Sequence, residues 1–196
     1  MLVTNILVVT QTAKPTKIEL TRERITSAAI ALFLDKGFDE TTVAEISAAA
    51  GVSEMTFFRY FKSKDSVVVD DPYDPFIASA IAIQPLELAP VVRAARGIRE
   101  AWGSIPEPGD ARTRDRIRVA ANTPSLQAAM WTNNAATGEF IANQLVADGA
   151  DPLASRVAAS ACLGALMAAL LDWSQTEEGS LGDRVRFALK VLEGEP

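Results

Sequence analysis

The part of the sequence best suited to chemistry is an aromatic and basic run at residues 56–64, Thr-Phe-Phe-Arg-Tyr-Phe-Lys-Ser-Lys. Phe57 and Phe61 are four residues apart, so on a helix they share a face and can anchor it to neighbouring helices. The polar members of the run remain for another face: Thr56, Arg59, Tyr60 and Lys64. A short helix held in this way can enter the major groove of DNA. The spacing therefore favours nucleic-acid recognition.

Composition argues against nucleophilic and metal chemistry. The 196 residues include no histidine and one cysteine, Cys162. Histidine-dependent nucleophile systems and histidine metal sites are therefore excluded. We find no paired-carboxylate motif, so the sequence predicts no catalytic residue, no metal site and no cofactor. The single cysteine indicates a structural role for Cys162 and a cytoplasmic location.

A second candidate site lies in the C-terminal half, where Asn134 and Thr137 interrupt an apolar stripe at helical spacing over residues 126–145. Buried polar groups need partners, so these two residues are either satisfied structural groups or face a ligand. Apolar walls with a few polar groups are typical of small-molecule pockets. With the three tryptophans of this half added, the ligand-facing alternative comprises Trp102, Met130, Trp131, Asn134, Thr137, Ile141 and Trp173.

Three arginines recur in steps of three ahead of this stripe, at Arg93, Arg96 and Arg99. On a helix they form one row. The row is either a solvated surface or an anchor for an anionic ligand group such as a phosphate, for which Arg96 is the candidate.

Three short helices are expected to position the first candidate site. Thr21 is taken as the cap of a helix over residues 21–37. Thr42 and Glu45 form a capping box at the start of a second helix, and Gly51 supplies a left-handed turn residue after it. Ser53 then caps a third helix that ends at about Tyr60. Two short helices joined by a tight turn form a helix-turn-helix.

Helical patterns continue to the C-terminus, and strand-like alternation is absent after residue 9. Proline, glycine and capping signals predict a fourth helix that begins after Ser63 and is broken by Pro72 and Pro75, followed by helices over residues 76–83, 91–102, 111–122, 124–148, 152–173 and 181–192. The fold class is therefore all-α. We divide the chain into a tail at 1–19, a helix-turn-helix domain at 20–66 and a helical ligand-binding and dimerisation domain at 67–196.

Charge is distributed unevenly along the chain, whose net charge is −6. Residues 1–66 carry 8 basic and 8 acidic side chains, whereas residues 67–196 carry 11 and 17. DNA phosphates respond to local charge, so an acidic chain with a neutral N-terminal third can still bind DNA. The uncharged apolar run at 157–171 is shorter than the roughly 20 residues of a membrane span, which favours a buried helix.

The residues Gly51-Val52-Ser53, Thr56 to Phe61 and Ser63-Lys64, with Thr41-Thr42-Val43 and Ile46 before them, resemble the DNA-binding domain of the TetR family of bacterial repressors. The resemblance covers roughly residues 20–68. Its members are all-helical homodimers with about nine helices per subunit. The aromatic run and the later Arg116-Ile117-Arg118 and Thr123-Pro124-Ser125-Leu126 are similar to the mycofactocin-regulator subgroup, which implies a C-terminal domain that binds an acyl-CoA-like ligand.

The resemblance assigns roles to seven residues of the DNA-binding part. Thr42 would bind a phosphate, and Glu54, Met55 and Thr56 would face base edges. Tyr60 and Lys64 would hold the DNA backbone. Phe58 stands where most members have tyrosine, so a hydroxyl contact to phosphate is missing, and Arg59 is expected to replace it. Glu54 can accept a hydrogen bond from a cytosine amino group.

The sequence thus predicts a ligand-responsive regulator that binds a DNA operator and no membrane. We expect it to form a homodimer through residues 153–173 and 181–192. Two alternatives stay open. One is an enzyme on a helical scaffold, which a turnover screen with acyl thioesters would reveal. The other is a helical adaptor that has kept the fold and lost DNA binding, which a shift assay on its own promoter would reveal.

Overall fold

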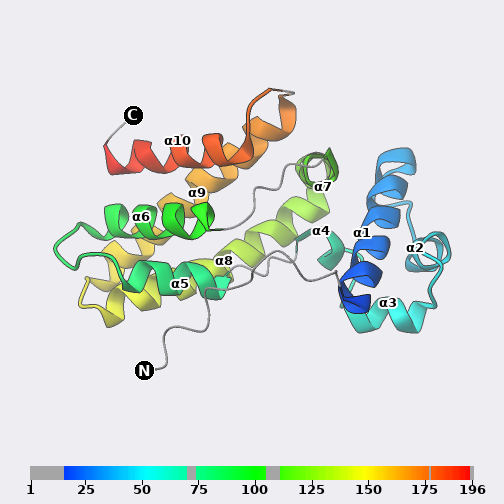
Figure 1. Ribbon diagram of the computed structural model, residues 1–196, viewed down its shortest axis with the longest axis horizontal. Helices are drawn as coiled ribbons and strands as arrows, with labels where there is room; N and C mark the ends of the chain where they lie inside the picture. Colours follow the sequence, from blue (N-terminus) through cyan, green and yellow to red (C-terminus); the bar gives the residue numbers. More distant parts are fainter. Residues whose placement is uncertain (1–15, 70–73, 105–110, 177, 195–196) are drawn as a thin grey trace.

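The structure, a computed structural model, describes residues 16–69, 74–104, 111–176 and 178–194, and these form ten helices and no strand. The predicted tail at 1–19 lies outside the described residues up to position 15. Three helices stand at one end of the molecule, blue to cyan in Figure 1: α1 (Lys17–Lys36), α2 (Val43–Ala49) and α3 (Glu54–Tyr60). The all-α prediction is confirmed for the described residues.

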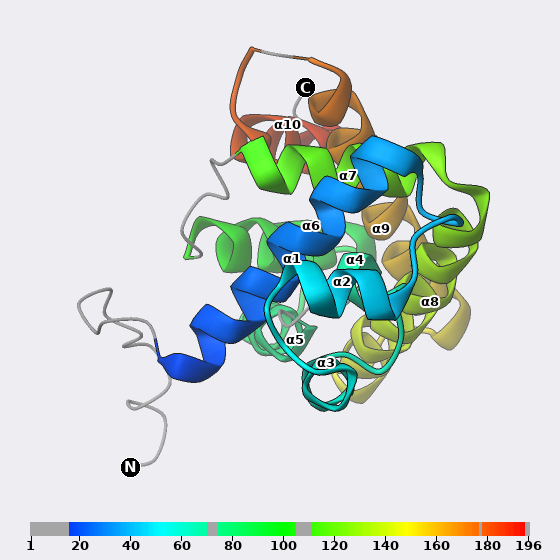
Figure 2. The same ribbon diagram turned by 90° about the vertical axis from the view of Figure 1, so that its right-hand side faces the viewer.

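The other seven helices form a second bundle. They are α4 (Ser66–Val69), α5 (Asp74–Ala82), α6 (Pro90–Gly103), α7 (Ala111–Asn122), α8 (Pro124–Ala147), α9 (Pro152–Gln175) and α10 (Leu181–Glu193). Through α4 and α7 this bundle packs against α1. The long helices α8 and α9 pack against each other, and α6 and α10 cover α9. Seen from the side in Figure 2, α7 lies across α1, which it contacts.

Side-chain caps mark the starts of five of the ten described helices, α1, α2, α3, α9 and α10. Ser53 and Ser180 accept hydrogen bonds from backbone N–H groups in the first turn of α3 and α10, and Asp151 does the same for α9. The start of α1 differs from prediction, because the helix begins at Lys17 after a capping box between Thr16 and Glu19. Thr21 instead lies inside α1 and donates to the carbonyl of Lys17.

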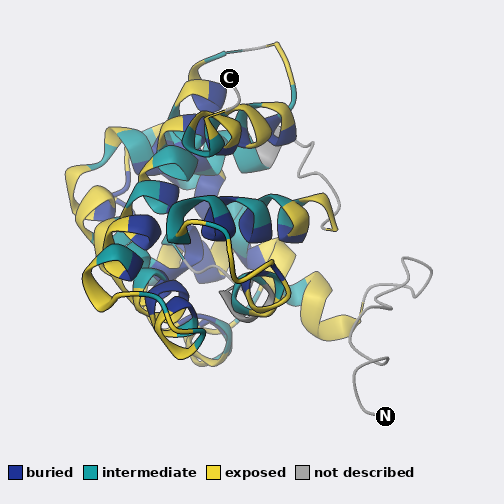
Figure 3. Ribbon diagram, turned by 90° about the vertical axis from the view of Figure 1, so that its left-hand side faces the viewer, coloured by how far each residue is buried: buried dark blue, intermediate teal, exposed yellow. Residues whose placement is uncertain are grey.

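The interior holds two apolar clusters. Figure 3 colours the buried residues dark blue. The N-terminal cluster is built around Phe57, Ile25 and Ile46, and the C-terminal cluster around Ile98, Ile141 and Val185. Helices α7 and α8 serve both clusters. On α7, Ile117 belongs to the C-terminal cluster, whereas Val119 belongs to the N-terminal one.

Helix α9 is the one described helix that is long and apolar enough to cross a membrane. It packs against α6, α7, α8 and α10, but only 28% of its most apolar stretch is buried, so the predicted buried helix holds for one face and not for the whole helix. Cys162 on this helix is buried, and burial raises the pKa of its thiol to about 12. The thiol therefore stays protonated and packs as an apolar group.

Candidate nucleic-acid interface

The predicted cap of the second helix is present at Thr42. Its hydroxyl accepts from the backbone N–H of Glu45 at 3.2 Å, and the Glu45 carboxylate accepts from the backbone N–H of Thr42 at 2.9 Å. Lys36, 2.5 Å away, and then Thr42 lower the pKa of Glu45 to about 2. The Thr42 side chain that we expected to bind phosphate therefore already completes a cap at the surface.

The turn between α2 and α3 depends on Gly51, which has a φ of +63°. This left-handed backbone favours glycine because other side chains are strained there. Arg24 of α1 reaches across to the carbonyl oxygens of Ala50 and Gly51, the second at 3.3 Å. A side chain from the first helix thus fixes the end of the second.

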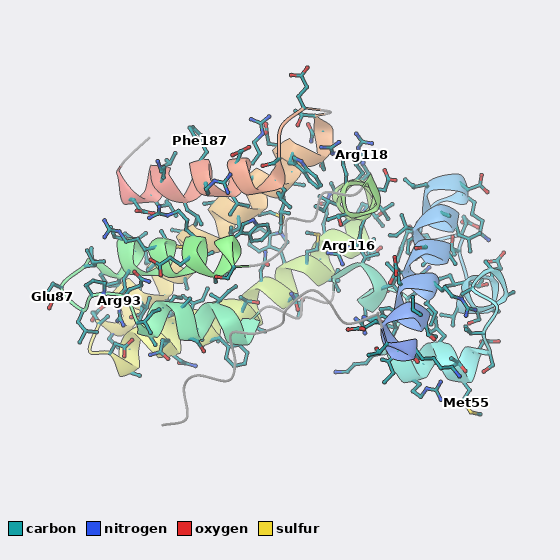
Figure 4. All side chains as sticks on the ribbon, in the orientation of Figure 1. Met55, Glu87, Arg93, Arg116, Arg118 and Phe187 are labelled. Atoms are coloured by element: carbon teal, nitrogen blue, oxygen red, sulfur yellow. The ribbon has the colours of Figure 1, made fainter. Side chains whose placement is uncertain are left out.

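Helix α3 is held from beneath by aromatic residues. Phe57 is fully buried and its ring centroid lies 5.7 Å from that of Phe61, as the sequence spacing predicted. Thr56 is half-buried, and its hydroxyl lies 3.0 Å from that of Ser53. Four residues face outward from the helix: Glu54, Met55, Phe58 and Arg59. Figure 4 shows Met55 at the tip of the molecule, directed away from it.

The residues predicted to bind the DNA backbone differ in how strongly their side chains are held by contacts within the protein. Tyr60 is half-buried against the N-terminal cluster, and Arg59 lies 5.4 Å from its ring centroid. The ammonium of Lys64 donates to the carbonyl oxygens of Phe38 at 2.6 Å and Thr41 at 2.9 Å. Lys64 therefore ties the loop between α1 and α2 to the start of α4, a role that the sequence did not indicate.

A basic hollow of about 780 Å³ separates α1 from α3. Its charged lining residues come from both helices: Lys17, Arg22, Arg24 and Arg59. Arg22 also donates to the carbonyl of Tyr60 at 3.0 Å. Lys17 escaped the sequence prediction because it was placed outside the first helix, whereas Arg22 and Arg24 lay inside the predicted helix but were given no DNA-binding role. Cations flanking an outward helix are suited to DNA phosphates, which position a protein on the duplex.

Three of the residues predicted to face a ligand share the C-terminal cluster, and the others lie outside it. Ile141 and Trp173 are buried in the C-terminal cluster, Trp102 packs against it, and Thr137 is buried and bonds to its own helix. Met130 packs against the N-terminal cluster, and Trp131 is 75% exposed. Asn134 is half-buried between them. The predicted ligand-facing residues are thus divided among the C-terminal cluster, the N-terminal cluster and the protein surface.

The arginine row on α6 is paired with acids instead of forming a free anchor. Arg93 is buried and lies 2.6 Å from Asp148, whose pKa is lowered because hydrogen bonds from Gln144 and Arg93 outweigh its partial burial. Arg96 and Arg99 lie 3.4 and 3.0 Å from Glu193 on α10. Arg93 is therefore neither a surface residue nor a free anchor, whereas Arg96 and Arg99 stay partly exposed, and the role of Arg96 as a ligand anchor remains a prediction.

Known proteins resemble the chain in both of its parts. Residues 25–70 match the family model described as bacterial regulatory proteins, tetR family, and residues 87–195 match the MftR C-terminal domain. The chain is 30% identical over 184 residues to MftR of Mycobacterium tuberculosis, named as a regulator of mycofactocin biosynthesis, with 88% of this chain and 89% of that protein covered.

Two further proteins extend this comparison. TcmR of Streptomyces glaucescens, a helix-turn-helix transcriptional regulator, is 29% identical over 120 residues, which cover 57% of this chain and 53% of TcmR. The crystal structure of NalD from Pseudomonas aeruginosa, a repressor of a multidrug efflux pump, superposes with a TM-score of 0.56 at 20% identity, covering 90% of this chain and 96% of NalD. NalD shows that the fold is shared.

Proposed function

The chain belongs to the TetR family of bacterial transcriptional regulators, and from this premise we propose that it represses transcription from a near-palindromic operator as a homodimer. A small amphipathic molecule would release it from the DNA. A protein that binds a bacterial operator acts in the cytoplasm. The proposed function includes no catalytic step.

The observation that carries the proposal is the outward face of α3 beside the basic hollow. Met55, Phe58 and Arg59 are exposed on a helix of seven residues that Phe57 fixes in place. Cations of α1 and α3 flank this face. A helix presented to base edges between phosphate-binding groups is how helix-turn-helix proteins dock in the major groove.

An apolar surface on α9 and α10 supports the homodimer. On α9, Leu153, Val157 and Gly164 are exposed along one face. On α10, which packs against α9, Phe187 is 63% exposed and Val191 is 50% exposed, and Figure 4 shows Phe187 directed away from the bundle. Monomers rarely leave large contiguous apolar surfaces open to water, so a second copy is the expected cover.

We propose an acyl-CoA-like effector because the C-terminal half matches the MftR C-terminal domain. The apolar cluster there offers Trp102, Ile141 and Trp173 to an acyl chain. Such a ligand acts as an inducer only if it prefers the conformation that does not fit DNA. A conformational change in the C-terminal domain would reach the DNA-binding helices through α7 and α8, because these two helices pack in both clusters.

Arg114 is better placed than Arg96 to meet the phosphates of such a ligand. Its guanidinium lies 4.5 Å from the ring centroid of Trp173, and its buried Nε has no hydrogen-bond partner among the described residues. Arg96 is paired with Glu193. A phosphate beside Arg114 would satisfy the open donor, because charge-assisted bonds to phosphate suit a guanidinium.

The proposal is tested with the full chain and labelled DNA from its own upstream region. We expect saturable binding by fluorescence anisotropy, at least about tenfold tighter than to a shuffled fragment, with loss on raising the salt concentration. Long-chain acyl-CoA should then release the DNA, and Arg114→Ala should weaken acyl-CoA more than free fatty acid. Equal affinity for both fragments would favour the adaptor alternative, and intact complexes at saturating acyl-CoA would contradict the effector class.

A further inference from the structure

The tip of α3 is apolar. Met55 is 85% exposed and Phe58 is 53% exposed, and the two are three residues apart, so they share one face of the helix. The Phe58 ring packs edge-on against Phe57, with centroids 5.4 Å apart and an interplanar angle of 86°. Because Phe57 is fully buried, this contact gives Phe58 a fixed direction, whereas Met55 has no such support and stays adaptable.

The charged neighbours of this face limit what it can read. Guanine is usually recognised by an arginine or lysine that approaches its two acceptors. Arg59 is the single cation among the four outward residues of α3, and it stands at the side that lines the basic hollow, near Tyr60. Glu54 adjoins Met55 and would be repelled by phosphates. The tip must therefore face the floor of the groove, with its cation at the edge.

We propose that Met55 and Phe58 recognise the 5-methyl groups of thymines in each operator half-site. The thymine methyl is the apolar group that the major groove presents, and methyl and aromatic side chains make favourable contacts with it. This inference rests on the operator binding proposed above and names what its recognition helix reads. Phe58, which is held in place, should be the stricter reader, and Met55 should tolerate small shifts of the methyl position.

The test first selects binding sites for the full chain from random duplex DNA. Each thymine of the selected half-site is then replaced by deoxyuridine, which removes the methyl group and leaves base pairing unchanged. We expect affinity to fall about fourfold for each methyl contacted, the value for burying one such carbon. Deoxyuridine outside the half-sites should have no effect. Because only the DNA changes, protein folding cannot produce this result.

Protein variants then assign each methyl to its reader. Phe58→Ala should bind more weakly and lose the response to deoxyuridine at one position, and Met55→Ala at another. Leu34→Ala removes a side chain that is similarly exposed on α1 and should respond as wild type does. Operator binding that is insensitive to deoxyuridine at every position would overturn the inference and leave the regulator proposal intact. Absence of binding to any selected DNA would overturn both.

Discussion

Apart from Lys36, which pairs with Glu45, the two ends of the molecule differ in how several of their arginines and lysines are bound. At the N-terminal end, Arg24 and Lys64 donate to backbone carbonyl oxygens. In the C-terminal bundle, Arg93 is bound by Asp148, and Arg96 and Arg99 by Glu193, whose side chain is 1% exposed. A carbonyl carries no net charge, so the first arrangement leaves each positive charge in place. A carboxylate cancels it.

This difference explains how an acidic chain can present a basic surface. The net charge of −6 resides in residues 67–196, where many cations are internally neutralised. The balanced N-terminal third keeps cations beside α3, where their field is felt within a Debye length of about 8 Å at physiological salt. Net charge is therefore a poor guide to DNA binding here, and the partner of each cation is a better one.

The largest expected effect comes from separating the two copies at the C-terminal end. Val157→Arg places a charge on the exposed face of α9 and should convert the dimer to a monomer, as measured by light scattering. Operator affinity should fall by about 100- to 10,000-fold, because a monomer loses the linkage between two half-sites. Leu86→Arg, in the exposed loop between α5 and α6, is the matched control. Undiminished dimerisation would place the interface elsewhere.

The next test asks whether the two apolar clusters unfold separately. Phe57→Ala should cost the N-terminal unit about 3–5 kcal/mol, the usual loss for a buried phenylalanine. DNA binding should disappear while light scattering still reports a dimer, and denaturation should show two transitions. Loss of the dimer as well would mean that α7 and α8 bind the two clusters into one cooperative unit.

A smaller effect is expected at the buried ion pair of the C-terminal end. Arg93→Met leaves Asp148 without its charged partner and should lower the free energy of unfolding by up to about 3 kcal/mol, less than for a sealed pair because Asp148 is 20% exposed. Because the folded pKa of Asp148 is lowered, the pair stabilises the fold above about pH 4, and this contribution is lost as pH falls. The variant should lose the part of that acid dependence that comes from Arg93 and keep the part that comes from the Gln144 hydrogen bond.

Lys64 and Arg59 then separate structure from DNA contact at the N-terminal end. Lys64→Met should lower stability by about 1–2 kcal/mol, because two carbonyl oxygens lose a charged donor. Arg59→Ala should leave stability unchanged and reduce the salt slope of DNA binding by about 0.9 for each lost phosphate contact, or about 1.8 for a dimer. If Lys64→Met instead reduced the salt slope and left stability unchanged, Lys64 would be the phosphate-binding residue.

The smallest effect concerns the cap of α2. The pKa of Glu45 is lowered to about 2, so its ionised form stabilises the fold above its ordinary pKa of 4.5, and that contribution is lost between pH 4.5 and 2. Glu45→Gln should flatten the acid dependence of the N-terminal unit in thermal unfolding, with Glu40→Gln as a surface control. An unchanged profile would show that the cap adds nothing measurable.

Local signals allowed most of the fold to be predicted. The helices begun by Thr42, Ser53 and Pro124 start as expected, because a cap or a proline acts within one turn. The first helix was set at Thr21 although Thr16 and Glu19 carry the full capping-box spacing. The resemblance implies about nine helices, whereas the described residues form ten, with the four-residue α4 included.

Side-chain partners that are distant in sequence could not be predicted. Arg93 and Asp148 are 55 residues apart, and Arg96 and Glu193 are 97 apart, so their pairing depends on the packed bundle. The apolar stripe over residues 126–145 is divided between two clusters because α8 passes from one to the other, and its ligand-facing role stays a prediction. The outward face of α3 was predictable in outline, because the buried Phe57 fixes which residues remain outside.

The sharing of α7 between both clusters bears on how this chain could be cut and recombined. Val119, Ala120 and Leu126 complete the cluster that holds α1 to α3. A fragment that stops near residue 70 would expose the side of the N-terminal cluster that these residues cover. Fusing α1 to α3 to another ligand-binding domain therefore requires α7 and the first turns of α8 as well. The transferable DNA-binding unit is thus discontinuous in sequence. Its boundary with the rest of the chain lies within α7 and α8 and not in a linker.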